Sequence, residues 1–203
     1  MDSTHGNCIY NVQCAERCIL YAAALYGDTL QTLVVAAGTV FNKVLVWDAW
    51  TKDTEAQVRV QLSGHEGVVF GVRFSKNGRR IMSTSDDRSV RVWNLDEKSA
   101  EAVFYGHGAR VWSCVEVDGD RLVSAAEDGT CRVWRNGETE DVWRLCPKNV
   151  WAVAAHCDGR MVAAACGDGA VCVWTVGGRQ RIERMDELDT IALPGPEQAL
   201  NRP

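Results

Sequence analysis

Short apolar runs that end in tryptophan recur along the chain. The runs VLVW, VRVW, CRVW and VCVW end at Trp47, Trp93, Trp134 and Trp174, at intervals of 46, 41 and 40 residues. Runs of this length, rich in valine, predict strands. Pairs such as Asp128-Gly129 lie between them and favour hairpin turns, because glycine accepts a positive φ without steric cost. The pattern predicts an all-β chain of about four repeated units.

Two of these units carry a further shared motif. Gly64-His65 precedes the strand that ends at Trp93, and Gly106-His107 precedes the strand that ends at Trp134. A period of about 40 to 45 residues with this motif is typical of a four-stranded propeller blade. The chain therefore resembles the WD40 family. The resemblance implies a WD40 β-propeller, and about four blades would form an incomplete, open one, since rings of this family usually have seven.

The resemblance also implies a buried hydrogen-bond network in each regular unit. A histidine precedes the innermost strand, a serine lies on the second strand, an aspartate in the next turn and a tryptophan on the third strand. The matching residues are His65, Ser83, Asp87 and Trp93 in one unit and His107, Ser124, Asp128 and Trp134 in the other. We expect them to be paired, since each such group costs about 1 to 3 kcal/mol if buried without a partner.

The same residue types occur in hydrolytic triads. Here, however, the constellation appears twice at one spacing, as structural repeats do and active sites do not. We therefore expect no catalytic residue, and an enzyme that uses His65 with Asp87 or His107 with Asp128 is the least favoured alternative.

The fourth and first units depart from the pattern. The fourth keeps Asp168 and Trp174, but Cys146 takes the histidine position and Ala164 the serine position. The first unit, from about Cys18 to Asp48, has no Gly-His pair and no turn aspartate, and its turn is two residues longer. We expect its strands to form nevertheless.

The organisation expected is four repeats over residues 17–176 with two flanking segments. Residues 1–16 could supply an outer strand of a preceding blade, with CIYNVQC as the candidate. Residues 177–203 hold three of the four prolines and many charges, which predicts disorder, with a short helix over RIERMDELDTIAL as the alternative. Because an open arc leaves strand edges bare, we expect a fragment, a truncated gene model or a short isoform, and a product that is poorly soluble or partly unfolded unless another chain completes the ring.

Cysteine usage and motifs predict no metal or cofactor. There are nine cysteines, and Cys114, Cys131, Cys166 and Cys172 lie inside predicted strands, which favours buried apolar roles over disulfides. The cluster His5, Cys8, Cys14 and Cys18 has zinc-binding residue types but no C-x-x-C pair. No phosphate-cradling glycine loop appears, and we expect neither a cofactor nor a small-molecule substrate.

The net charge of −5 is unfavourable for general adhesion to nucleic acid. Three cations, Arg88, Arg110 and Lys148, are predicted near the histidine and aspartate turns. They are candidates for RNA phosphate contacts, with scattered solvating charge as the alternative. No apolar run approaches the ~20 residues that span a bilayer, and no signal peptide is evident, so we expect a cytoplasmic protein without membrane contact.

The divergent first unit suggests a narrower family. The stretch RCILYAAALYGDTLQTLVVAAGTVFNKVLVWD, with its GTVFN turn at residues 38–42, resembles the WD-repeat partner subunit of the eukaryotic tRNA anticodon-loop 2′-O-ribose methyltransferase. The match runs from about Arg17 to Trp174. It implies a non-catalytic adaptor that binds a separate methyltransferase and tRNA in support of wobble-nucleotide methylation. A generic protein-interaction propeller, such as a signalling or ubiquitin-ligase adaptor, is the alternative.

Overall fold

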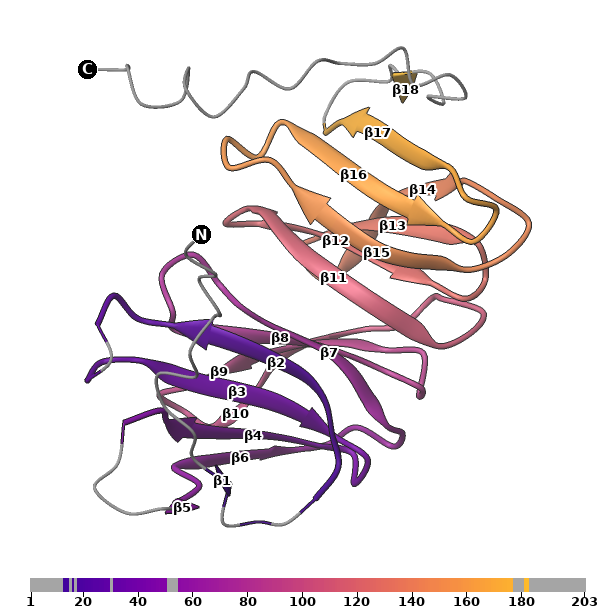
Figure 1. Cartoon of the computed structure of the whole chain (residues 1–203). Coiled ribbons are helices and arrows are strands. Elements are labelled where there is room, and N and C mark those ends of the chain that lie inside the picture. Colours follow the sequence, from indigo (N-terminus) through magenta and orange to yellow (C-terminus); the bar gives the residue numbers. More distant parts are fainter. Residues whose placement is uncertain are drawn as a thin grey trace, which may run out of the picture.

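The computed structural model describes residues 13–14, 16, 18–29, 31–50, 55–176 and 181–182. These residues form strands and turns only, and four sheets of four strands each follow one another as the blades of an open arc (Figure 1). The all-β fold and the incomplete propeller are thereby confirmed. No helix long and apolar enough to cross a membrane occurs in the described part of the chain.

The four blades follow the chain order. Blade 1 consists of β2 (Leu20–Tyr26), β3 (Val34–Thr39), β4 (Lys43–Asp48) and β6 (Val60–Ser63). Blade 2 consists of β7 (Val69–Phe74), β8 (Arg80–Ser85), β9 (Val90–Asn94) and β10 (Ser99–Phe104). Blade 3 consists of β11 (Val111–Asp118), β12 (Arg121–Ala126), β13 (Thr130–Arg135) and β14 (Glu138–Arg144). Blade 4 consists of β15 (Val150–Ala155), β16 (Met161–Cys166), β17 (Val171–Thr175) and β18 (Arg181–Ile182).

Each blade is an antiparallel meander, and its strands differ in burial. The third strand of blade 1, β4, and the second strand of blade 2, β8, are buried along almost their whole length. Blade 2 packs between blades 1 and 3, whereas in blade 1 Ala56 packs with Leu45 and Trp47 of β4 in a further cluster. The sequence of β4, KVLVWD, accordingly contains a continuous apolar run. The outer strand β14, with the sequence ETEDVWR, is largely exposed. The middle strands β4 and β8 are therefore more buried than the outer strand β14 and than the innermost strand β2, which is also largely exposed.

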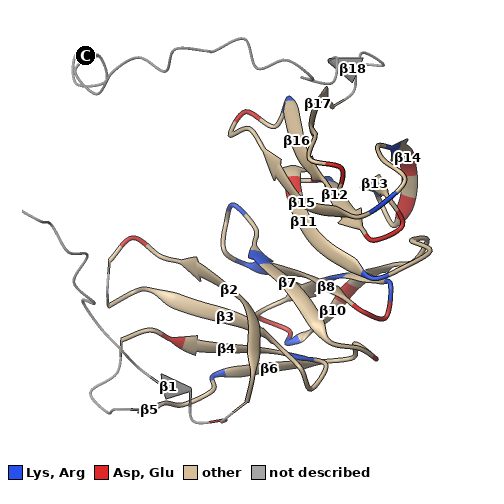
Figure 2. Cartoon of the chain, turned by 45° about the vertical axis from the view of Figure 1, so that its right-hand side comes forward, with Lys and Arg blue, Asp and Glu red and all other residues tan. Residues whose placement is uncertain are grey.

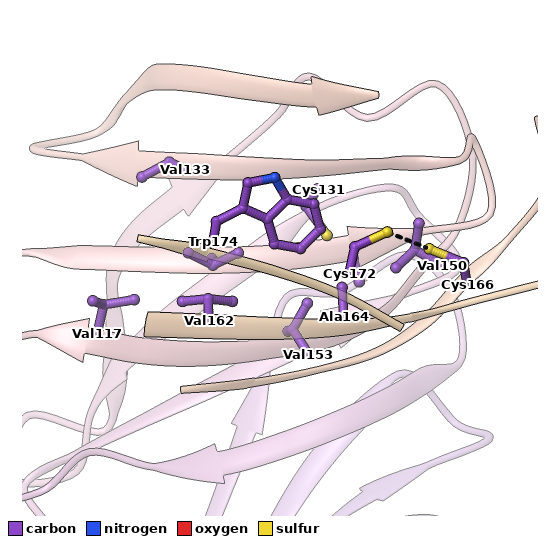
Figure 3. Packing of buried hydrophobic residues seen from close by; sticks show 12 residues of the cluster. Val117, Cys131, Val133, Val150, Val153, Val162, Ala164, Cys166, Cys172 and Trp174 are labelled. Atoms are coloured by element: carbon purple, nitrogen blue, oxygen red, sulfur yellow. Dashed lines mark hydrogen bonds between the residues drawn. The ribbon is translucent and has the colours of Figure 1, made fainter. Parts of the chain in front are cut away.

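Three hydrophobic clusters join the four blades. One combines residues of blades 1 and 2 and includes Trp93, and the next combines blades 2 and 3 and includes Trp134. The third lies between blades 3 and 4 and includes Trp174 (Figure 3). In blades 2, 3 and 4 the tryptophan that ends the third strand therefore packs in the interface with the preceding blade, whereas Trp47 of blade 1 packs with Ala56.

The innermost strands β2, β7, β11 and β15 contact one another in series along the inner side of the arc. All four contain a β-bulge at the same place, where one residue near the strand start has no partner on the second strand. The bulged residues are Tyr21, Phe70, Trp112 and Trp151. Bulges of this kind redirect a side chain, and here each redirects an aromatic one.

The flanking segments differ from the expectation where the structure describes them. Gln13–Cys14 forms strand β1, which pairs in parallel with β5 (Glu55–Ala56) in a two-stranded sheet, and it joins no preceding blade. Arg181–Ile182 forms β18, the outer strand of blade 4, inside the segment expected to be disordered. Its pairing with β17 supplies backbone hydrogen bonds that a disordered tail lacks. Most of residues 1–16 and of 177–203, including most of the segment considered for a helix, lies outside the described residues.

Candidate functional site

Blade 2 contains the first hydrogen-bond network. His65 lies in the loop before the innermost strand, which we call the leading loop. Its Nδ1 lies 2.8 Å from Asp87 Oδ2, and its Nε2 lies 2.7 Å from Ser83 Oγ. Trp93 Nε1 donates to the same Ser83 Oγ at 2.7 Å. Because a carboxylate only accepts, the proton lies on Nδ1, and one donor chain runs from the indole through the hydroxyl and imidazole to the carboxylate.

Asp87 is the last acceptor in this series of hydrogen bonds and also stabilises its own turn. Its carboxylate accepts hydrogen bonds from the backbone N–H of Glu66 at 3.0 Å and from the N–H and Oγ of Ser89 at 2.9 and 2.6 Å. Burial alone would raise the pKa of Asp87, but the hydrogen bonds from His65, Ser89 and Glu66 hold it well below its ordinary value. Burial lowers the pKa of His65 despite the neighbouring carboxylate. The imidazole is therefore neutral.

Blade 3 repeats the network. His107 Nδ1 lies 3.0 Å from Asp128 Oδ2, its Nε2 lies 2.8 Å from Ser124 Oγ, and Trp134 Nε1 donates to Ser124 at 2.7 Å. Thr130 takes the place of Ser89 and donates its hydroxyl to Asp128 at 2.6 Å. The structure thus brings together all eight residues that the sequence assigned to the two networks.

Both histidines are unsuited to catalysis in this arrangement. Their side chains have no exposed surface. Both ring nitrogens of His65 and of His107 are engaged with residues of the same blade. A general base must reach the proton that it removes from a substrate. Neither histidine can do so without unfolding its network.

Blades 1 and 4 lack the network. In blade 1, Ala37 occupies the serine position, and the buried Trp47 Nε1 has no hydrogen-bond partner within the described residues. Thr39 replaces the turn aspartate, because its Oγ1 accepts hydrogen bonds from the N–H groups of Phe41 and Lys43 at 3.2 Å. In blade 4, Asp168 Oδ1 still accepts from Ala170 N–H at 3.2 Å. Trp174 stacks on Trp143 with ring centroids 4.9 Å apart.

The four bulged aromatic residues form a continuous row, which we call the aromatic ladder. Ring centroids are 5.5 Å apart from Tyr21 to Phe70, 4.8 Å from Phe70 to Trp112 and 5.1 Å from Trp112 to Trp151. The end members Tyr21 and Trp151 are 57% and 50% exposed. A groove of about 240 Å³ lies along the ladder and is also lined by Arg73. The ladder is the main accessible aromatic surface that the blades share.

The three predicted cations lie at the end of the blades where the innermost strands start, which is also the end that carries the ladder. Arg110 is placed over Trp112, with its guanidinium carbon 5.6 Å from the ring centroid. Lys148 is exposed in the leading loop of blade 4, next to Asn149, whose Oδ1 accepts a hydrogen bond from Trp112 Nε1 at 3.3 Å. Arg88 is exposed in the turn between β8 and β9, at a φ of 67°.

Carboxylates balance part of this charge. Arg110 Nε lies 3.2 Å from Asp86 Oδ1 and 2.9 Å from Glu127 Oε2. Figure 2 shows acidic and basic segments interspersed over the blades. The accessible chemistry at this end is therefore aromatic and mixed in charge.

The sequence contains a signal for the ladder that the strand pattern did not reveal. Tyr21, Phe70, Trp112 and Trp151 recur near the period of the Trp-ended strands, one in each unit. An aromatic residue that repeats with the blade period and directly follows an apolar strand start marks the bulge position.

Four-stranded blades, two of which contain a Trp–Ser–His–Asp hydrogen-bond chain, define a WD-repeat propeller. The family model described as "WD domain, G-beta repeat" matches residues 56–94, 98–135 and 140–175, and the chain belongs to this family.

Among its relatives are three animal proteins with one name, "tRNA (34-2'-O)-methyltransferase regulator WDR6". The chain is 34% identical to the Bos taurus protein and 31% identical to the Homo sapiens protein, each over 190 residues, or 88% of this chain. It is 30% identical to the Drosophila melanogaster protein over 142 residues, or 60% of this chain. The chain spans only 17% of the length of the two mammalian relatives and 14% of the fly protein. The resemblance inferred from the first unit is confirmed.

Proposed function

We propose that this chain acts as a non-catalytic adaptor in cytoplasmic tRNA 2′-O-methylation, binding a separate methyltransferase and tRNA. The observation that carries the proposal is the match over 190 residues to proteins named as regulators of a tRNA (34-2'-O)-methyltransferase. The match covers most of this chain, the divergent first blade included. A regulator that orients two partners raises the rate by positioning them and requires no catalytic group of its own.

The buried state of His65 and His107 supports an adaptor role. Both imidazoles are fully engaged in hydrogen bonds of their networks, one within blade 2 and one within blade 3. In this proposal the methyltransferase supplies the methyl-donor site and the groups that activate the 2′-hydroxyl. The propeller supplies a rigid surface on which leading loops and turns can vary without disturbing the packed strands.

The aromatic ladder is the surface that we assign to RNA. Bases of a single-stranded loop are unstacked and can pack on exposed aromatic rings, and such stacking is tolerant of sequence. Trp151 and Tyr21 offer exposed ring surface at the two ends of the ladder. Lys148 and Arg88 are exposed, and we assign them contacts with the backbone phosphates of such a loop. Arg110 can add its charge once phosphate competes with Asp86 and Glu127.

The first test is recovery of partners. The tagged chain is expressed in animal cells, and co-purified proteins and RNAs are identified by mass spectrometry and sequencing. We expect a methyltransferase together with tRNA. Recovery of neither would contradict the proposal, and a different stable protein partner in their place would favour the generic interaction propeller.

The second test separates RNA contact from protein contact. The double variant Trp112→Ala/Trp151→Ala should lower photocrosslinking of tRNA to the chain at least about tenfold, since each lost base stack is worth about 1 to 3 kcal/mol. It should leave methyltransferase recovery unchanged. Tyr105→Ala is the matched control, because Tyr105 is 66% exposed but outside the ladder. Equal crosslinking in all three proteins would exclude the ladder as the RNA surface.

Charge reversal tests the phosphate contacts. Replacing Arg88, Arg110 and Lys148 by Glu should weaken tRNA binding and reduce its dependence on salt concentration. Unchanged tRNA binding in the triple variant would show that the assignment of these three cations is wrong.

A further inference from the structure

At the leading-loop end of blade 4, cysteine side chains lie at the place where blades 2 and 3 have their hydrogen-bond networks. Ligand atoms of Cys146, Cys166 and Asp168 all lie within 4.8 Å of one another. Cys166 Sγ lies 3.8 Å from Cys172 Sγ, and Figure 3 shows these two side chains facing each other beside Trp174. We call Cys146, Cys166, Cys172 and Asp168 the thiol cluster.

The members of the cluster come from the elements that the networks join in the regular blades. Cys146 occupies the position of His65 in the leading loop, and Asp168 that of Asp87 in the turn. Cys172 is paired with Ala164 across β16 and β17 in the same way as Arg91 is paired with Ser83 across β8 and β9. Cys166 ends the second strand. A single ligand at this point would contact the leading loop, the second strand, the turn and the third strand together.

The separations suit a tetrahedral metal. Zinc–sulfur bonds of about 2.3 Å at tetrahedral angles place two ligating sulfur atoms about 3.8 Å apart. Cys166 Sγ and Cys172 Sγ already have that separation. The distances among Cys146, Cys166 and Asp168 are at most 4.8 Å. For these three residues, rotation of side chains in the leading loop and the turn closes the remaining gap of about 1 Å. Cys172 is not part of this group of three and is placed at the site by its 3.8 Å contact with Cys166.

We propose that Cys146, Cys166, Cys172 and Asp168 bind one structural Zn²⁺ ion. Three thiolates and one carboxylate complete a four-coordinate shell, which is the arrangement of structural rather than catalytic zinc. Thiolate ligands also select zinc over calcium or magnesium. Cys166 and Cys172 are buried, whereas Asp168 is exposed and gives the ion a path from solvent.

The ion replaces the missing network as the link between the leading loop and the strands of blade 4. In blade 4 no histidine and no serine occupy the network positions, yet the leading loop still has to be fastened to the strands. Bonds from zinc to Cys146 and to Cys166 fasten it directly. Sequence reasoning did not find this site because its ligands lie at positions 146, 166, 168 and 172, a spacing set by the blade and not by a local motif.

Metal content is the first test, and it does not depend on the proposed role in tRNA methylation. The full chain is purified under reducing conditions from zinc-supplemented cells, and bound metals are measured by elemental mass spectrometry. We expect about one zinc per chain. Cobalt added to the metal-free chain should give the thiolate-to-cobalt charge-transfer band of a tetrahedral site. A wild-type chain that holds no zinc and shows no such band would overturn the proposal.

Variants locate the site. Cys166→Ser should strongly weaken the cobalt band, because one of the three thiolates is lost. Asp168→Asn should lower zinc affinity more than about 100-fold, which exceeds the typical loss from removing an outer-shell partner. Asp168 lies in an exposed turn, so this variant should keep its fold, which circular dichroism checks. Cys157→Ser is the matched control, because Cys157 is an exposed thiol outside the cluster. A cobalt band that survives unchanged in Cys166→Ser would contradict the assignment.

Thermal unfolding gives an independent result. Chelation of zinc should lower the melting temperature of the wild-type chain and of Cys157→Ser, since bound metal stabilises only the folded state. It should leave the melting temperature of Asp168→Asn nearly unchanged. Equal chelator effects on all three proteins would contradict a stabilising ion at the thiol cluster.

Discussion

Blades 2 and 3 differ from blades 1 and 4 in how they hold the tryptophan of the third strand. In the first pair, the indole N–H begins a donor chain that ends on a turn aspartate. In blade 1 the indole N–H of Trp47 is buried without a partner among the described residues, and in blade 4 Trp174 stacks on Trp143. All four blades nevertheless have the same strand order. Hydrophobic pattern and turn chemistry therefore suffice to form a blade, and the network adds stability.

The largest effect should come from breaking a network at its centre. Ser124 Oγ accepts from Trp134 Nε1 and bonds His107 Nε2, so Ser124→Ala leaves two buried polar groups without partners. We expect the free energy of unfolding, measured in urea, to fall by about 2 to 4 kcal/mol. Ser99→Ala on the exposed outer strand of blade 2 is the control, with a change below about 0.5 kcal/mol. Equal losses in the two variants would show that the network contributes nothing.

Acid should weaken the regular blades in two pH ranges. The pKa of His65 is lower in the folded state, so the unfolded chain takes up a proton first, and stability falls as pH decreases from about 6.5. The pKa values of Asp87 and Asp128 are also lower in the folded state, so their contribution is complete above about pH 4 and is lost below it.

The upper range can be assigned to one residue. Urea unfolding between pH 7 and 5 should show a steeper decline in stability for the wild type than for His65→Gln, because the variant lacks the imidazole at position 65 whose pKa differs between the folded and unfolded states. The difference should be smaller than the loss in Ser124→Ala. Parallel pH profiles for the two proteins would exclude His65 as the source.

Blade 1 offers the reverse experiment. Ala37→Ser places a hydroxyl at the position where Ser83 accepts from Trp93 in blade 2, and it should satisfy Trp47 Nε1. We expect stabilisation by about 1 kcal/mol, measured as a higher urea midpoint. Ala36→Ser is the matched control, because Ala36 is equally buried but its side chain points to the other face of β3. It should destabilise the chain, and a gain in both variants would contradict the explanation.

The smallest effect is expected at the surface. Arg110 bridges Asp86 of blade 2 and Glu127 of blade 3, and all three side chains are about half exposed. Arg110→Gln should change the free energy of unfolding by less than about 1 kcal/mol, since exposed ion pairs are screened by solvent. A loss as large as that of Ser124→Ala would show that this exposed bridge contributes as much to stability as a buried network does.

The sequence predicted what repeats with the blade period and missed what depends on the packing of blades. Trp93 and His65 were placed in one network because the resemblance to the WD40 family implies it, and the same residue types recur at Trp134 and His107. The aromatic ladder was missed, because Trp112 and Trp151 occupy bulges and strand alternation does not reveal a bulge. The thiol cluster was missed for a related reason, since Cys146 and Cys166 meet only once the leading loop folds over blade 4.

The networks have a further consequence for how the chain folds. In blade 2 the three bonded pairs are separated by only 22, 18 and 10 positions along the chain. Contacts this local close quickly, because little chain entropy is lost before they form. Each regular blade can therefore form its own hydrogen-bond network as soon as its third strand has left the ribosome, before the next blade has been synthesised. Assembly then proceeds as a sequence of short, nearest-neighbour steps from the N-terminal side.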